Sequence, residues 1–145
     1  RRLAFQIGGY KTRMEKINQN TLALIEYFKT CEHIKEIYWP YQEPFREHYQ
    51  ALQKHSKAAG GVISLVFDQP LEKVYDRINL PKGPSLGTEF TLLMPYVYLA
   101  HYDLVSTQQG RKHLEAVGIH PDLLRVSVGL ENVETIIGIF DEALK

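Results

Sequence analysis

An arginine stands in the most regular strand pattern of the chain. In the segment from Leu124 to Leu130 every second residue is apolar, so Arg125 falls on the opposite face from its apolar neighbours. The planar guanidinium group of arginine can hold a carboxylate through two parallel hydrogen bonds. An arginine on a solvated strand face, or one paired with an acidic residue of the same chain, would show the same pattern. Arg125 is therefore a candidate carboxylate-binding residue, with both structural alternatives open.

A second candidate is the short segment Ser85-Leu86-Gly87, which follows the helix-breaking run Pro81-Lys82-Gly83-Pro84. A glycine at position 87 allows a ligand or another segment to approach the backbone closely. Taken alone, the segment predicts equally well a turn that leads into a strand over residues 85–93.

Metal-ligating and nucleotide-binding patterns do not occur at the spacings that such sites need. None of the six histidines pairs with another at the three-to-five-residue spacing of common zinc motifs, and Cys31 is the single cysteine. The sequence holds no P-loop and no Gly-x-Gly-x-x-Gly motif. We therefore expect no metal site and no nucleotide site of these kinds.

The composition is typical of one globular domain without a polyanionic partner. The 145 residues carry 17 Lys+Arg and 17 Asp+Glu, a formal net charge of +0, which leaves no excess charge to attract nucleic acid or an anionic membrane. No apolar run approaches the ~20 residues that a membrane helix needs, and Gln6 with the glycines after it interrupts a leader-like start. Together with the single cysteine, these features lead us to expect a cytoplasmic protein with no nucleic acid or membrane partner.

Apolar periodicity places helices and strands in alternation. Thr12 and Glu15 have the spacing of a capping box, which predicts the start of the first helix. The nearly continuous apolar run 62–67 predicts a strand at the centre of a sheet. The full pattern predicts helices over about 13–30, from Phe45 to before Gly60, over 71–78, 110–117 and 133–144, and strands over 33–39, 62–67, 85–93 and 123–130. This is an α+β domain of two layers, with a small mixed or antiparallel sheet packed on helices and no sign of a second domain.

The order of several segments resembles a known enzyme family. The segments are Lys11-Thr12-Arg13-Met14-Glu15, Gly60-Gly61-Val62-Ile63-Ser64, Ser85-Leu86-Gly87, and Leu124 to Glu131 followed by a final helix. They resemble the C-terminal domain of the pyridoxal-phosphate-dependent enzymes of cysteine and methionine metabolism, which include cystathionine γ-synthase, cystathionine β- and γ-lyases, methionine γ-lyase and homoserine sulfhydrylases. The resemblance covers essentially the whole chain, and the arginine strand is its most specific part.

The resemblance implies a role for each candidate residue. Arg125 would bind the α-carboxylate of an amino-acid substrate, Ser85 would contribute to substrate binding, and Ser85, Leu86 and Gly87 would lie close to the cofactor. The fold would be the small C-terminal domain of a fold type I transferase, and the cofactor would be pyridoxal phosphate. The reaction would be β- or γ-elimination or replacement on cystathionine, methionine, cysteine or an activated homoserine, as in transsulfuration, in an enzyme that is a homotetramer when full length.

The sequence also departs from that family. The lysine that carries the cofactor and the phosphate-binding turn belong to a large N-terminal domain without a counterpart here, so we expect residues 1–145 to be one C-terminal domain that is inactive alone. Pro84 stands where family members often have a polar residue, which leaves the distal specificity open. The segment from Met94 to His101 matches its family counterpart too weakly for roles to be transferred.

A different class of function fits the same composition. A non-catalytic regulatory or interaction module that binds an amino acid between strands and helices would also place an arginine on a strand. Such a module would bind a free amino acid saturably through Arg125 without a further domain, whereas the enzyme-domain interpretation predicts little affinity.

Overall fold

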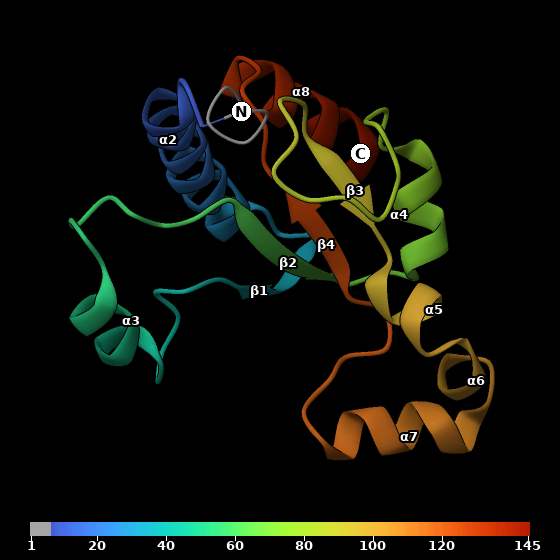
Figure 1. Cartoon of the computed structure of the whole chain (residues 1–145). Coiled ribbons are helices and arrows are strands. Elements are labelled where there is room, and N and C mark those ends of the chain that lie inside the picture. Colours follow the sequence, from blue (N-terminus) through green and yellow to red (C-terminus); the bar gives the residue numbers. More distant parts are fainter. Residues whose placement is uncertain (1–6) are drawn as a thin grey trace.

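A four-stranded sheet, with helices on one face, forms the centre of the molecule (Figure 1). The computed structural model describes residues 7–145, and Gln6, on which the rejection of a leader rested, lies outside the described residues. The strands are β1 (Ile34–Tyr38), β2 (Val62–Phe67), β3 (Leu92–Met94) and β4 (Leu124–Ser127), in the order β1-β2-β4-β3. Every neighbouring pair is antiparallel, which decides between the two predicted sheet types, and β2 is an interior strand as predicted.

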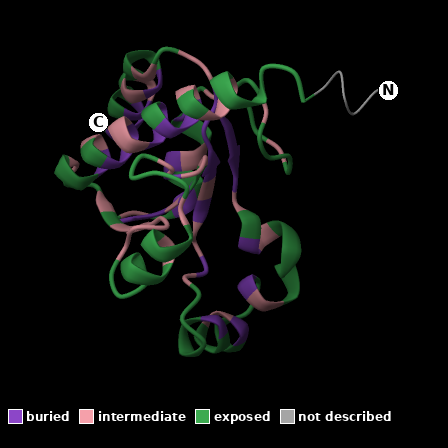
Figure 2. Cartoon of the chain, turned by 60° about the vertical axis from the view of Figure 1, so that its left-hand side comes forward, coloured by how far each residue is buried: buried purple, intermediate pink, exposed green. Residues whose placement is uncertain are grey.

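The core lies between the sheet and three helices, α2 (Tyr10–Thr30), α4 (Leu71–Arg77) and α8 (Val133–Leu144). Phe28 of α2 and Phe140 of α8 are almost fully buried, and their rings meet edge to face at a centroid distance of 5.0 Å. Leu65 and Val126 point from the sheet into the same core. Figure 2 shows the buried residues concentrated on the sheet and on the inward sides of these helices. The predicted two-layer α+β architecture is confirmed.

The first helix begins earlier than the capping box predicts. α2 starts at Tyr10, so Thr12 and Glu15 lie inside the helix and do not cap it. Gly9 stands at the N-cap in the left-handed conformation (φ 76°), and its carbonyl accepts the hydrogen bond of the Arg13 N–H at 3.0 Å. The predicted start was wrong because this glycine lets the chain turn into a helix without a side-chain cap.

The predicted strand over 85–93 is mostly a loop. Only Leu92–Met94 pair as β3, because the preceding backbone groups bond to side chains instead of a neighbouring strand. The Thr88 hydroxyl donates to the Phe90 carbonyl, and the Thr91 N–H donates to Glu131. β4 also ends earlier than predicted, at Ser127, and beyond Val128 the Gly129 and Leu130 N–H groups bond to this loop.

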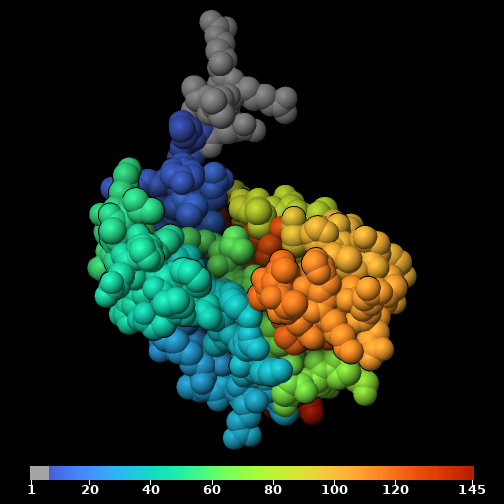
Figure 3. All heavy atoms as spheres, turned by 90° about the horizontal axis from the view of Figure 1, so that it is seen from below, coloured from blue at the N-terminus to red at the C-terminus, as the bar shows by residue number. Residues whose placement is uncertain are grey.

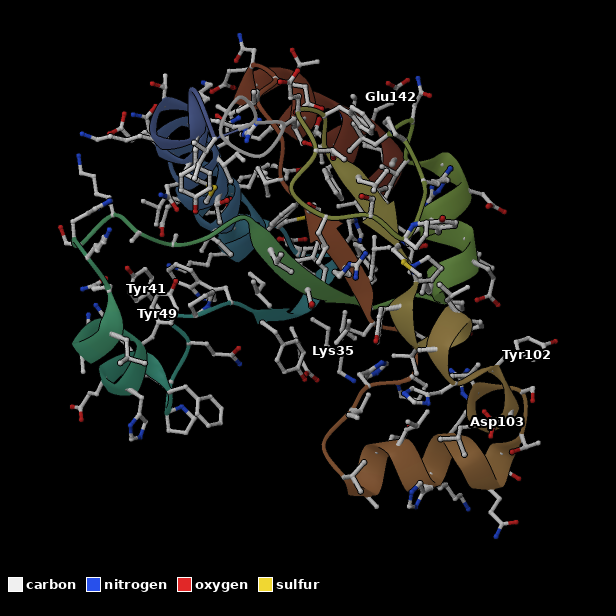
Figure 4. The ribbon with its side chains drawn as sticks, viewed as in Figure 1. Lys35, Tyr41, Tyr49, Tyr102, Asp103 and Glu142 are labelled. Atoms are coloured by element: carbon white, nitrogen blue, oxygen red, sulfur yellow. The ribbon has the colours of Figure 1, made fainter. Side chains whose placement is uncertain are left out.

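A second, smaller group of helices follows β3. The helices α5 (Tyr96–Ala100), α6 (Tyr102–Val105) and α7 (Gln108–Ala116) surround a small core of Val97, Val105 and Leu114, and we call residues 96–116 the α5–α7 lobe. The sequence predicted α7 but not the two short helices before it. Figure 4 shows Tyr102 and Asp103 at its outer edge.

The helix α3 (Arg46–Leu52) is shorter than predicted and has no buried residue. Leu52 is 86% exposed, and the helix is attached through aromatic contacts, with Tyr41 and Tyr49 pointing toward one another at 5.1 Å between ring centroids (Figure 4). Seen from below, the segment around α3 and the α5–α7 lobe stand on two sides of the molecule (Figure 3).

The terminal helix is capped as the sequence predicts, and the cap supplies a test of stability. The Asn132 side-chain oxygen accepts the Glu134 N–H at 3.1 Å. We expect Asn132→Ala to lower the free energy of unfolding by about 1 kcal/mol, because a donor at the helix start loses its partner. Urea denaturation followed by circular dichroism measures this difference, and Asn132→Asp, which keeps an acceptor, serves as the control. An alanine variant as stable as the aspartate variant would contradict the prediction.

Candidate functional site

Arg125 lies in the middle of the sheet, on the face away from the core helices. It pairs with Ser64 of β2 on one side and with Met94 of β3 on the other. Its neighbours Leu124 and Val126 are fully buried in the core, so the alternation of a strand turns the Arg125 side chain to the opposite face. The predicted position of Arg125 is confirmed.

The Arg125 guanidinium is held by the loop from Pro84 to Thr91, which we call the Ser85 loop. Its Nη2 donates to the carbonyl oxygens of Pro84 at 3.1 Å and Ser85 at 3.2 Å, and lies 3.4 Å from the Met94 sulfur. The Tyr96 ring lies under the group, with its centroid 5.5 Å from Cζ. The structure thus brings together Arg125 and Ser85, two residues that the sequence singled out 40 positions apart.

The Arg125 Nε–H is buried and has no hydrogen-bond partner within the part of the chain that the structure describes. Over the same residues, 7–145, Arg125 forms no salt bridge, so pairing with an internal acid does not explain it. A buried donor of a charged group without a partner is costly, and natural structures seldom tolerate it without a reason. Within residues 7–145 the guanidinium thus has an unpaired donor and no charged partner, which makes it a candidate anion-binding group.

The Ser85-Leu86-Gly87 turn is exposed to solvent and is fixed to β4 by a hydrogen bond. The Gly87 N–H donates to the Ser127 hydroxyl oxygen at 3.1 Å, and Gly87 has a positive φ of 65°, which favours glycine. Leu86 is 52% exposed. The turn therefore presents Ser85 and Leu86 outward beside Arg125.

The segment from Gly83 to Gly87 also has the spacing Gly-x-Ser-x-Gly, which in hydrolases places a nucleophilic serine on a turn between a strand and a helix. Here Ser85 lies in a loop whose next element is the strand β3, and no histidine bonds to it within the described residues. The structural context of a nucleophilic serine is missing, so this spacing carries no hydrolase chemistry.

Two residues of the site were missed from the sequence. Met94 and Tyr96 belong to the segment to which no role was transferred, and both contact the Arg125 side chain. The alignment of β3 with β4 places Met94 directly opposite Arg125, and this register cannot be obtained from local periodicity.

A second charged cluster is internally paired. Arg111 Nη2 bonds both oxygens of Asp122, at 2.7 and 2.8 Å, and the Tyr98 hydroxyl donates to Asp122 at 2.9 Å. The hydrogen bonds to Tyr98 and Asp122 raise the pKa of the Arg111 guanidinium, and burial raises the pKa of the Tyr98 hydroxyl. These groups border an open cavity of about 430 Å³ together with Asp68 and other residues. Because its charges satisfy each other, the cluster ties the α5–α7 lobe together and is not a candidate anion site.

Two further observations concern ions and membranes. No group of three or more potential metal-ligating side chains gathers within residues 7–145. No helix over the same residues is long and apolar enough to cross a membrane.

Comparison with known proteins gives a consistent result. A family model described as Cys/Met metabolism PLP-dependent enzyme matches residues 7–145. The chain is 39% identical over 142 residues to the L-2-amino-4-chloropent-4-enoate dechlorinase/desaturase of Streptantibioticus cattleyicolor, covering 98% of this chain and 28% of that protein. It is 37% identical over 138 residues to the cystathionine gamma-synthase of Neurospora crassa, covering 94% of this chain and 21% of that protein.

The fold is similar to that of solved structures. The cystathionine gamma-lyase from Lactobacillus plantarum complexed with L-serine superposes with a TM-score of 0.76 at 18% identity, over 93% of this chain and 35% of that protein. The chain therefore spans between a fifth and about a third of the length of the relatives that it matches.

Proposed function

The chain belongs to the Cys/Met metabolism PLP-dependent enzyme family, and from this premise we propose that residues 1–145 are the C-terminal, substrate-carboxylate-binding domain of a longer enzyme. The reaction of the whole enzyme is elimination or replacement at Cβ or Cγ of an amino acid of the cystathionine, methionine, cysteine or activated homoserine type. The observation that supports this proposal best is the half-buried Arg125, which lies beside the exposed Ser85 turn and which among residues 7–145 has no acidic partner and no acceptor for its Nε–H.

Arg125 is the group proposed to bind the substrate α-carboxylate. The carbonyls of Pro84 and Ser85 fix one terminal nitrogen, and the Tyr96 ring supports the plane of the group. A guanidinium held in this way loses little further conformational freedom when it binds a carboxylate. The fixed carboxylate in turn sets which Cα bond of the substrate is presented for reaction. Ser85 and the backbone of Leu86 and Gly87 form the adjoining wall.

The described residues do not by themselves fit a pyridoxal phosphate site. None of the contacts of Arg125 or of the turn from Ser85 to Gly87 involves a lysine. Lys82, the lysine nearest to Ser85 in the sequence, instead places its Nζ over the Tyr75 ring, 4.9 Å from the ring centroid. We propose that the attachment lysine and the phosphate-binding groups belong to a preceding domain, and that this chain supplies the carboxylate side of the site. Pyridoxal phosphate, where it is bound, acts as an electron sink for carbanion chemistry at Cα.

The names of the relatives support recognition of the shared end of the substrate. Those names refer to cystathionine and to a chlorinated aminopentenoate, compounds with different side chains but a common α-amino carboxylate. Arg125 is suited to that common group. Pro84 contributes only its carbonyl to the contacts described, so the distal side chain of the substrate remains unassigned.

The partners and location are part of the same proposal. The preceding cofactor-binding domain and further copies of the enzyme, in a homotetramer, are the proposed protein partners. The single cysteine supports a cytoplasmic location.

The test is an absorbance spectrum of the full-length protein that contains this chain, purified with added pyridoxal phosphate. We expect a band of bound cofactor that changes when L-cystathionine or L-methionine is added, whereas the 145-residue chain alone shows no such band and no turnover.

A folded, cofactor-supplied protein without such a band would contradict the proposal. Isothermal titration of the isolated chain with the same amino acids then decides on the alternative. Saturable binding that Arg125→Ala abolishes would favour a non-catalytic amino-acid-binding module.

A further inference from the structure

The loop that holds Arg125 has little regular structure of its own. Between Pro84 and Thr91 the chain forms no helix or strand, and its exposed turn is joined to the body by side-chain hydrogen bonds. In Figure 1 this loop runs between α4 and β3, past the end of β4. Its position therefore depends on a small number of contacts with the residues of β4 and the connection to α8.

Side chains or amides of every second residue from Arg125 to Glu131 make these contacts, and between them the Leu130 N–H donates to the Glu89 carbonyl of the loop at 2.8 Å. Arg125 binds the carbonyls of Pro84 and Ser85, and the Ser127 hydroxyl accepts the Gly87 N–H. The Gly129 N–H donates to the Thr91 hydroxyl at 3.0 Å, and the Glu131 carboxylate accepts from Thr91 as well. The chain from β4 to the start of α8 thus carries the candidate substrate group in the strand and, in the connection that follows, an acidic anchor for the loop.

The acidic anchor is a hydrogen-bonded network in which the half-buried Glu131 carboxylate meets the buried Thr91. The Thr91 hydroxyl donates to Glu131 at 2.9 Å, and the Thr91 N–H donates to the other carboxylate oxygen. Thr91 is fully buried, so neither donor can bond to water if the carboxylate is lost. Asn20 of α2, 1% exposed, donates to the backbone carbonyls of Gly129 and Glu131, both at 2.9 Å. Three segments far apart in sequence are joined at this point.

We propose that Asn20, Thr91 and Glu131, which we call the loop latch, position the Ser85 loop and thereby the Arg125 guanidinium for binding the substrate carboxylate. They are positioning residues, since none of them contacts Arg125. The inference rests on the proposed function of Arg125. It goes further by giving a positioning role to three polar residues that are not part of the hydrophobic core. If the latch opens, the loop carbonyls move away from Nη2 and the guanidinium is no longer held.

The test compares two substitutions of one residue in the full-length protein. Thr91→Val keeps the shape of the side chain but removes the hydroxyl, and Thr91→Ser keeps the hydroxyl. We expect Thr91→Val to raise KM for L-cystathionine or L-methionine about tenfold with kcat changed by no more than about twofold, because only substrate binding is weakened. Thr91→Ser is expected to behave like the unsubstituted protein. Equal KM values for the two variants would overturn the proposal.

A double-mutant cycle shows whether the effect passes through Arg125. Added to Arg125→Ala, the Thr91→Val substitution should raise KM by less than about twofold, because the guanidinium that the latch positions is already absent. A further tenfold increase in the double variant would show that the latch acts independently of Arg125, and would overturn the proposal.

Hydrogen exchange of the same proteins separates failure of the latch from failure of the proposed function. The Gly87 amide, which donates to the Ser127 hydroxyl, should exchange about tenfold faster in Thr91→Val than in Thr91→Ser, with the amides of α8 unchanged. If the protein turns over neither amino acid, the proposed function fails, while this comparison still decides on the latch. Equal exchange rates of the Gly87 amide in Thr91→Val and Thr91→Ser would overturn the proposed role of the loop latch.

Discussion

Replacement of Arg125 by alanine in the full-length enzyme is expected to lower kcat/KM for its amino-acid substrate by about 100- to 1000-fold. The loss follows from the removal of a charge-assisted carboxylate contact, which is worth about 3–4 kcal/mol when it is shielded from water. In the structure, Arg125 has no acidic partner within residues 7–145, and its Nε–H is buried without an acceptor, so the substrate carboxylate is its proposed counter-ion. Steady-state kinetics with L-cystathionine and L-methionine measure the effect.

Two further variants make this prediction specific. Arg125→Lys keeps the positive charge but cannot form two parallel hydrogen bonds to a carboxylate. Its kcat/KM should therefore lie between those of Arg125→Ala and the unsubstituted enzyme. Arg77→Ala is the matched control, because Arg77 is an exposed arginine of α4 that bonds only to the Lys73 carbonyl and Gln69. An unchanged kcat/KM in Arg125→Ala, or an equal loss in Arg77→Ala, would show that Arg125 does not bind the substrate.

Introducing a single methyl group at Gly129 is expected to destabilise the chain by about 3 kcal/mol. A Cβ atom at this position would lie 2.4 Å from the Phe90 carbonyl carbon and 2.5 Å from the Thr91 nitrogen, both backbone atoms, and 2.5 Å from a Glu131 carboxylate oxygen. Backbone atoms cannot move aside as a flexible side chain can, so Gly129→Ala must push the loop at Phe90 and Thr91 away from the segment that follows β4. Urea denaturation of the 145-residue chain followed by circular dichroism measures the change.

Gly138→Ala is the matched control for this substitution. Gly138 is an exposed residue of α8, and no atom lies within 4 Å of the position that a Cβ would occupy. Alanine there should increase the free energy of unfolding by about 0.5–1 kcal/mol, because glycine is a poor helix former. The same substitution should therefore lower the free energy of unfolding at position 129 and raise it at position 138. A Gly129→Ala chain as stable as the original would mean that the loop does not pack on β4 as described.

Much of the element order was predictable because its signals are local. A nearly continuous apolar run identified β2, alternation of apolar residues identified β4, and helical spacing identified α2 and α8. The ends of elements were less accurate: α2 begins at Tyr10, after Gly9, rather than at the capping box, and the chain from Ser85 to Thr91 bonds mostly to side chains instead of forming a strand. A backbone that finds its partners in distant side chains leaves no periodic signal.

The sequence by itself determined that Arg125 lies on the face of a strand opposite its apolar neighbours, because that alternation depends on adjacent residues, whereas for Ser85 it left a strand and a turn as alternatives. Only the tertiary structure decided that these two residues touch, that Met94 and Tyr96 join them, and that Glu131 anchors the loop through Thr91. Each of these contacts joins segments about 30 to 40 residues apart. Their formation depends on strand register and on the satisfaction of buried hydrogen bonds, which are set only when the whole chain packs.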